Sequence, residues 1–195
     1  MNLQKEINGL ILSGGKSSRM GINKGQLVFH NRPQQEYLFD LLGDFFTMTY
    51  VSCKTEKDIP SNLNPLPDLF DIATPLNGIL TAFEKDHQIA WLSIPVDMPL
   101  IDKDSINVLL TNRDKTKLAT CFYDSDGTNP EPLFCLWESS AYPALQAFYK
   151  SGGVSPRKFL QTHEVKLLRS PAPIHMNINT PEEFEAFRKK HQQQN

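Results

Sequence analysis

The residues with the clearest chemical potential lie in one stretch, LILSGGKSSRMGINKG, at positions 10–25. An apolar run ends at Ser13, and two adjacent glycines follow it. Three cations, Lys16, Arg19 and Lys24, then appear within nine positions. Glycines let successive backbone N–H groups point at one anion, and the cations supply the opposite charge. After the first strand of an open α/β sheet, this pattern predicts a site for the phosphates of a nucleotide.

Two familiar phosphate motifs do not fit this stretch. The triplet Gly15, Lys16, Ser17 imitates the end of a P-loop, but that motif needs a glycine where the chain has Leu10. A dinucleotide fingerprint is excluded because the GxGxxG spacing is missing and no acidic residue follows at the required distance. An ordinary surface loop is the alternative, yet a glycine pair and three cations exceed what a simple connection needs.

A second chemical signal is Asp97, which follows the apolar run 90–94 and stands between Pro95 and Pro99. A carboxylate at the end of a central parallel strand lies beside the phosphate loop, and Mg²⁺ bound to a triphosphate uses one or two carboxylates. We therefore predict that Asp97 binds Mg²⁺. The alternative is a cap on the next helix, a role that suits Asp102 better.

Other reactive side chains give no motif. The five histidines show none of the spacings of a metal site. Cys53, Cys121 and Cys135 are odd in number and widely spaced, so they predict neither a disulfide framework nor a metal pair. Free thiols in a reducing cytoplasm are the simplest account.

These residues must be positioned by an α/β fold, because short apolar runs alternate with longer segments of helical period. The predicted strands are 9–13, 47–53, 90–94, 118–123, 133–137 and 165–169, and the predicted helices are 34–42, 76–86, 104–112, 140–149, 156–162 and 181–191. Turn residues at 124–130 predict a hairpin or wider loop that interrupts an otherwise parallel sheet. Thr180, Pro181 and Glu183 form the best helix start signal.

Composition limits the remaining possibilities. The chain has 195 residues, 39% of them hydrophobic, which favours a single domain over 1–195 with a substantial core. Its net charge of −2 argues against binding to nucleic acid or to an anionic membrane. The apolar stretches are shorter than a membrane span or a secretory signal requires, so we expect a cytoplasmic protein.

The pattern LxGGxSxRMGxxKG resembles the molybdenum cofactor guanylyltransferases, the MobA family, within the nucleotidyltransferases of Rossmann-like fold. The resemblance continues in order through DIATPLNGI at 71–79, PVDMPLI at 95–101, the Pro-Leu-Phe strand at 131–136, the Ser-x-Arg-x-Phe-Leu helix at 155–160 and NINTPEE at 177–183. It implies a three-layer Rossmann-like sandwich with a mostly parallel central sheet.

The resemblance also implies roles for individual residues. Nucleotide contacts fall on Leu12, Ser13, Gly14 and Gly15 through their backbone groups, on Lys24 and Arg19 at the phosphates, on Asp71 at guanine and on Asp97 through Mg²⁺. Lys24, Arg19 and Asp97 form the implied catalytic set, whereas Arg157, Asn177 and Asn179 match positions around the pterin. Asparagines before a capped helix can also simply organise a turn. The chain departs from the family at Ser13, Asn23, Asn77 and Val96, and it has Ser52 and Cys53 where an asparagine is usual.

The implied reaction transfers GMP from GTP to the terminal phosphate of molybdopterin, with Mg²⁺ as cofactor and with release of pyrophosphate. Transient contacts with other proteins of molybdenum cofactor biosynthesis and with acceptor molybdoenzymes would accompany it. The alternatives are a CTP-dependent molybdopterin cytidylyltransferase, a sugar-phosphate nucleotidyltransferase and a nucleotide-binding regulatory module without turnover. Ser-Gly-Gly at 13–15 and Asp-Met-Pro at 97–99 favour GTP over CTP.

Overall fold

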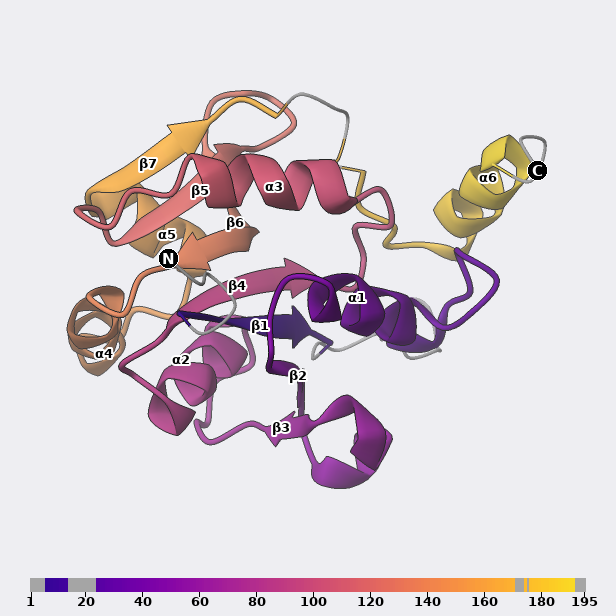
Figure 1. The fold of residues 1–195 in the computed structure, drawn as a ribbon. Coiled ribbons are helices and arrows are strands. Elements are labelled where there is room, and N and C mark those ends of the chain that lie inside the picture. Colours follow the sequence, from indigo (N-terminus) through magenta and orange to yellow (C-terminus); the bar gives the residue numbers. More distant parts are fainter. Residues whose placement is uncertain (1–5, 14–23, 171–173, 175, 192–195) are drawn as a thin grey trace.

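A computed structural model describes residues 6–13, 24–170, 174 and 176–191. Its centre is a seven-stranded sheet in the order β3-β2-β1-β4-β6-β5-β7 (Figure 1). Six strands run in one direction, and β6 alone is antiparallel to its neighbours β4 and β5. The strands are β1 (Ile7–Leu12), β2 (Thr49–Cys53), β3 (Pro65–Pro67), β4 (Ala90–Pro95), β5 (Ala119–Tyr123), β6 (Pro130–Trp137) and β7 (Val165–Leu168). The predicted α/β class with a mostly parallel sheet is confirmed.

Helices cover both faces of this sheet and form the outer layers of a sandwich (Figure 1). They are α1 (Gln34–Gly43), α2 (Leu76–Lys85), α3 (Lys103–Thr111), α4 (Ala141–Lys150), α5 (Pro156–Thr162) and α6 (Pro181–His191). One buried cluster joins α1 and α3 to the sheet, and a second joins α2, α4 and α5 to the opposite face. Successive strand residues alternate between the clusters: Ile11 enters the first, and Leu10 and Leu12 enter the second.

The C-terminal segment returns to the carboxyl end of β4. The N–H of Ile178 donates to the carbonyl of Asp97 at 2.8 Å. Beyond it, Phe184 and Phe187 of α6 pack edge-on against Phe29, with ring centroids 5.1 and 5.3 Å apart. The predicted helix start is confirmed, since the Glu183 N–H donates to Thr180 Oγ1 at 3.2 Å and the Thr180 N–H donates to Glu183 Oε2 at 3.0 Å.

Two strand predictions need correction. The strand β3, Pro65–Pro67, was not predicted; it is a three-residue edge strand flanked by prolines, and such strands leave little pattern in a sequence. The strand β6 begins at Pro130, three residues before its predicted start, because the hairpin after β5 closes early. In that hairpin Gly127 has φ +68°, a conformation that suits glycine.

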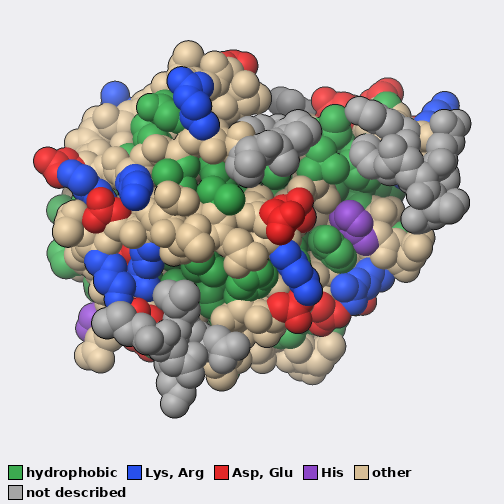
Figure 2. Space-filling model, turned by 45° about the horizontal axis from the view of Figure 1, so that its top comes forward, with side chains coloured by type: hydrophobic (Ala, Val, Ile, Leu, Met, Phe, Trp, Pro, Cys, Tyr) green, Lys and Arg blue, Asp and Glu red, His purple; other side chains and the backbone are tan. Residues whose placement is uncertain are grey.

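Three further expectations concern the cysteines, membrane-spanning helices and the charge of the surface. The three cysteines are free and buried. No helix in the described part of the chain is long and apolar enough to cross a membrane. On the face drawn in Figure 2, basic and acidic side chains lie side by side in several mixed groups, which agrees with the small net charge.

Candidate active site

A pocket of about 570 Å³ opens where β1 and β2 end and α2 begins. Leu12 lies at the end of β1, Ser52 comes from β2, and segment 68–75 with the first turn of α2 supplies the remaining wall. The carboxyl ends of adjacent parallel strands are where α/β proteins bind ligands, and this volume suits a nucleotide base. Two of the predicted site residues, Leu12 and Asp71, line this pocket.

Gly78 allows α2 to come this close to the strand ends. A Cβ atom at this position would lie 2.9 Å from Ser52 Oγ and 3.0 Å from Leu12 Cδ2. Real side-chain contacts are longer than this, so a larger residue would displace the two strand-end side chains. The glycine of the DIATPLNGI motif thus fixes the shape of the pocket floor.

The pocket wall is held by Asn77, one of the departures from the family pattern. Its buried amide makes four hydrogen bonds: Nδ2 donates to the carbonyls of Phe70 (2.5 Å) and Ile72 (3.1 Å), and Oδ1 accepts from the Phe70 N–H and the Thr81 hydroxyl (both 3.2 Å). Thr81 in turn accepts the N–H of Leu69 at 3.1 Å. Asparagine here therefore organises segment 69–72, which an alanine could not do.

Two carboxylates face this pocket, and only one of them was predicted. Asp71 is exposed at the pocket lining. Asp68 is half-buried, and burial raises the pKa of its carboxyl to about 6. Its N–H donates to the carbonyl of Cys53 at 2.8 Å, which continues the pairing of β3 with β2. Asp68 was missed because it follows the unpredicted strand β3, and Lys54, which also lines the pocket, was missed with it.

Asp97 lies two residues beyond β4 and is half-buried. The hydrogen bond from Ile178 to its carbonyl brings the exposed Asn177 and Asn179 of the NINTPEE motif beside it. Capping of α3 belongs to Asp102, whose Oδ1 accepts the Ser105 N–H at 2.8 Å. The competing interpretation of Asp97 as the cap is therefore wrong.

A buried glutamate that the sequence did not single out lies within electrostatic range of Asp97. Glu131 is the second residue of β6, which pairs antiparallel with β4, the strand that ends just before Asp97. Glu131 is 6% exposed, and burial raises the pKa of its carboxyl, with a smaller upward contribution from Asp97. The Leu133 N–H, which donates to its Oε1 at 3.0 Å, and the charge of Arg157 act in the opposite direction.

Arg157 lies in the first turn of α5, where Ser155 caps the helix by accepting the Lys158 N–H. Its Nη1 donates to Asp124 Oδ2 at 2.7 Å. Because Glu131 is influenced electrostatically by both Arg157 and Asp97, these two predicted residues share a neighbour at one end of the sheet.

The structure describes some of the predicted site residues incompletely or not at all. Gly14, Gly15 and Arg19 lie outside the described residues. The backbone of Lys24 begins a short 3₁₀ turn, Lys24–Gln26, that precedes α1. The Ser13 hydroxyl is buried and has no hydrogen-bond partner in the described structure.

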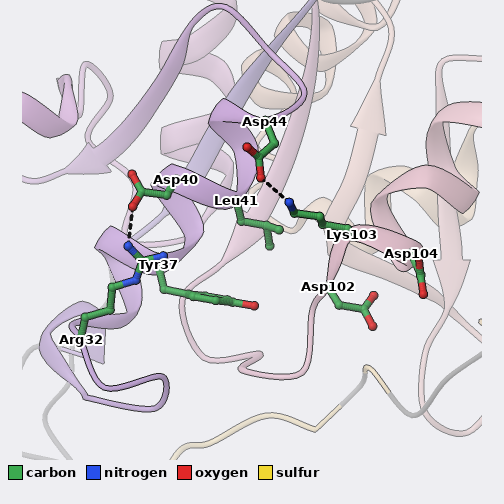
Figure 3. Close-up of a pocket in the computed structure, with 8 residues that line it drawn as sticks. All are labelled: Arg32, Tyr37, Asp40, Leu41, Asp44, Asp102, Lys103 and Asp104. Atoms are coloured by element: carbon green, nitrogen blue, oxygen red, sulfur yellow. Dashed lines mark hydrogen bonds and ion pairs between the residues drawn. The ribbon is translucent and has the colours of Figure 1, made fainter.

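A second pocket, of about 480 Å³, lies between α1 and α3 (Figure 3). Four of its charged side chains form two ion pairs, Arg32 with Asp40 and Lys103 with Asp44. Tyr37 extends between these pairs (Figure 3). None of the predicted site residues lines this second pocket, and its exposed ion pairs already satisfy much of its charge, so the pocket at β1 and β2 is the better candidate.

The chain is similar in sequence to a known protein family and to several of its relatives. The family described as MobA-like NTP transferase domain matches residues 9–167. The molybdenum cofactor biosynthesis bifunctional protein of Synechocystis sp. is 30% identical over 188 residues, which are 93% of this chain but 53% of that protein, so the chain spans about half of it. The molybdenum cofactor guanylyltransferase of Pasteurella multocida is 29% identical over 179 residues, 88% of this chain and 94% of that protein.

Solved structures show the same fold. Molybdopterin-guanine dinucleotide biosynthesis protein A from Archaeoglobus fulgidus superimposes with a TM-score of 0.79 at 20% identity, covering 95% of this chain and 99% of that one. The 2-C-methyl-D-erythritol 4-phosphate cytidylyltransferase from Thermus thermophilus gives a TM-score of 0.68 at 14% identity, covering 95% and 98%. The architecture is therefore shared by proteins that are named for different biosynthetic reactions.

Proposed function

The chain belongs to the MobA-like NTP transferase family, and from this premise we propose that it transfers GMP from GTP to the terminal phosphate of molybdopterin. The family makes it a nucleotidyltransferase, and the proposal specifies the two substrates that it joins. The observation that carries the proposal is the pocket at β1 and β2, which presents carboxylates to a base and opens at the strand ends next to Asp97.

Guanine is the base that this pocket suits. Its N1–H and N2–H are adjacent donors, and one carboxylate accepts both. Asp71, the residue implied by the family resemblance, lies exposed at the lining, whereas Asp68 presents a half-buried carboxylate to the same space. Phe70, Ile72 and Leu12 provide apolar surface for the ring. Cytosine lacks this donor pair, so the same carboxylates favour GTP over CTP.

The triphosphate would extend from this pocket towards the glycine loop. The backbone N–H groups of Gly14 and Gly15 would contact it, while Lys24 and Arg19 would neutralise the departing pyrophosphate. Leu12 ends β1 and Ser13 follows it at the start of that loop, so both would lie where the base meets the phosphates.

Asp97 fits the proposed Mg²⁺. Asp97 follows the end of β4, its charge acts on the nearby buried carboxyl of Glu131, and oxygen donors are the ligands that Mg²⁺ prefers. When bound, the cation would neutralise charge on the phosphate oxygens. Asp97 would hold it, and the nucleotide phosphates would complete its coordination.

The chemical step needs little from the protein beyond alignment. An oxygen of the terminal phosphate of the acceptor forms a bond to the α-phosphorus of GTP, the bond from the α-phosphorus to the oxygen bridging to the β-phosphorus breaks, and pyrophosphate leaves with that electron pair. A phosphate monoester is largely ionised near neutral pH, so no general base is required. Positioned cations and N–H groups lower the barrier by stabilising charge on the phosphates.

The acceptor would lie on the other side of Asp97. Arg157 would contact an anionic group of molybdopterin, and Asn177 and Asn179 would meet the pterin edge, where amides can both donate and accept. Contacts with other proteins of the same biosynthetic route would be transient and would lie outside this site.

Ligand-dependent stabilisation followed by turnover tests the proposal. GTP at a hundred times its Kd should add about 2.7 kcal/mol, which raises Tm by about 2 to 4 °C per kcal/mol for a chain of this size. The shift should exceed those with CTP and ATP, should increase with Mg²⁺ and should weaken in Asp97→Ala. Pyrophosphate release should then require both GTP and molybdopterin. A preference for CTP would indicate a cytidylyltransferase, and binding without pyrophosphate release would indicate a regulatory module.

A further inference from the structure

Asp124, in the loop between β5 and β6, uses its two carboxylate oxygens for different purposes. Oδ1 accepts the N–H groups of Thr128 (3.3 Å) and Asn129 (3.2 Å), which closes the hairpin loop. Oδ2 accepts Nη1 of Arg157 at 2.7 Å. The Asp124 side chain is only 10% exposed, so it is a fixed anchor rather than a mobile surface group.

Asp124 holds one side of the Arg157 guanidinium. A guanidinium has five N–H donors in a rigid plane, and the hydrogen bond that the described residues provide uses Nη1. The side chain is 41% exposed, so part of it is accessible to a ligand. A guanidinium whose plane is fixed by a carboxylate on one side can bind an anion on the other with little further loss of freedom.

The position of this pair connects it to the reacting groups. Glu131 is the second residue of β6, the strand that follows the hairpin, and the pKa of its carboxyl is lowered by the charge of Arg157 and raised by the charge of Asp97. Arg157 therefore lies within electrostatic range of Glu131, on which Asp97 also acts, and neither Asp124 nor Arg157 lines the base pocket.

We propose that Asp124 is a positioning residue for the acceptor: it orients Arg157 so that the free side of the guanidinium binds an anionic group of the acceptor. The inference rests on the proposed function and adds a residue to it. The hairpin between β5 and β6 then determines acceptor affinity without touching the nucleotide.

A purely structural role for the hairpin can be separated from this one. The loop contacts α5 a second time, through Gln161 Nε2, which donates to Asn129 Oδ1 at 2.8 Å. Gln161→Ala removes that contact and leaves Asp124 and Arg157 untouched. Asp124→Asn keeps the size of the side chain but has only one acceptor oxygen, so it cannot serve both the loop N–H groups and Arg157.

The test measures GMP transfer with molybdopterin as the varied substrate, in wild type, Asp124→Asn, Arg157→Ala, the double variant and Gln161→Ala. Molybdopterin binding is followed in parallel by quenching of intrinsic fluorescence, and GTP binding by thermal shift. In Asp124→Asn, KM and Kd for molybdopterin should rise about tenfold, while the GTP shift stays at the wild-type value. Arg157→Ala should lose at least as much, and the double variant should lose no more than Arg157→Ala. Gln161→Ala should stay within about twofold of wild type.

The outcomes separate the two claims. Unchanged acceptor KM and Kd in Asp124→Asn would overturn the positioning role, and so would an equal loss in Gln161→Ala, because that would indicate a general effect of hairpin docking. A wild-type protein that binds molybdopterin but transfers no GMP would refute the proposed function, while an Asp124-dependent Kd would still support the positioning role.

Discussion

The two halves of the site are built from different interactions. Around the base pocket, segment 69–72 is held by neutral hydrogen bonds that converge on the amide of Asn77. At the acceptor end, charged groups act on one another: the charge of Asp97 acts on Glu131, and Arg157 is paired with Asp124. Neutral amides keep their hydrogen bonds over a wide pH range. In a group of interacting charges, by contrast, neutralising one side chain changes the interactions of the others. The nucleotide half should therefore respond mainly to packing changes and the acceptor half to charge changes.

A hydrogen bond joins the base pocket to the helix that carries Arg157. The hydroxyl of Thr74, which lines the base pocket, donates to the carbonyl of Val154 at 2.6 Å, one residue before the Ser155 cap of α5. The base pocket and the helix carrying Arg157 are thus neighbours through a short loop. A charge change at the acceptor end should still leave the pocket wall in place, because its four amide hydrogen bonds involve none of those charges.

The largest effect should follow from Asp97→Asn. It removes the charge proposed to hold Mg²⁺ while leaving the backbone carbonyl that Ile178 contacts. Loss of a metal that stabilises phosphate charge costs several kcal/mol, so kcat/KM should fall by about 10³ in an assay of pyrophosphate release. Asp104→Asn, an exposed change in the first turn of α3, should leave activity near wild type. Activity within tenfold of wild type in Asp97→Asn would contradict the contrast between the two halves, because the acceptor half would then not depend on this charge.

A packing change in the nucleotide half should come next. In Gly78→Ala the new Cβ meets Ser52 and Leu12, so stability should fall by about 1 to 3 kcal/mol and GTP should bind more weakly. Gly43→Ala is the matched control, because no atom lies within 4 Å of the added Cβ. Thermal unfolding with and without GTP measures both effects. If the two variants were equally stable and equally shifted by GTP, the close approach at Gly78 would not shape the pocket.

Asn77→Ala tests the neutral half directly. It deletes four hydrogen bonds and leaves the polar groups of Phe70 and Thr81 without that partner, which should cost about 2 kcal/mol. GTP affinity should fall because segment 69–72 loses its support, while the KM for molybdopterin should stay the same. Asn112→Ala, at the exposed end of α3, should change stability by less than about 0.5 kcal/mol. A rise in the acceptor KM alone would reverse the assignment of the two halves.

The sequence predicts the fold well because its strands are apolar runs bounded by turn residues. The prediction fails at β3, where two prolines and a single buried leucine give no periodic signal. That failure carries over to the site, since Asp68 is recognisable as a pocket residue only once β3 is paired with β2. Asp71, in contrast, stands inside a motif with fixed spacing and could be found without the structure.

Charge partners are the second limit of sequence reasoning. Asp97 follows an apolar run and was found by that position, but Glu131 lies 34 positions later, and the pairing of β6 with β4 brings its strand beside the one that ends before Asp97. Asp124 likewise has the sequence appearance of a turn residue, which it is, and its bond to Arg157 requires the packing of α5 on the hairpin. Long-range pairs of this kind follow from topology rather than from local spacing.

The smallest effect, and the sharpest test of the base pocket, is Asp68→Asn. The folded-state pKa of Asp68, about 6, lies above its ordinary value of 3.8, because burial disfavours the charged form. The folded protein therefore binds this proton more tightly than the unfolded chain, and stability falls as pH rises from about 4 through about 6. Asparagine removes that loss, and because Asp68 is only half-buried the gain at neutral pH should be about 1 kcal/mol, or about 2 to 4 °C in Tm. GTP should nevertheless bind more weakly, since the amide offers one acceptor where guanine presents two donors. Thermal unfolding between pH 4 and pH 8, with and without GTP, measures both. A variant that lost stability at neutral pH would show that the charged carboxylate supports the fold, and one that kept the full GTP shift would leave Asp71 as the carboxylate that recognises guanine.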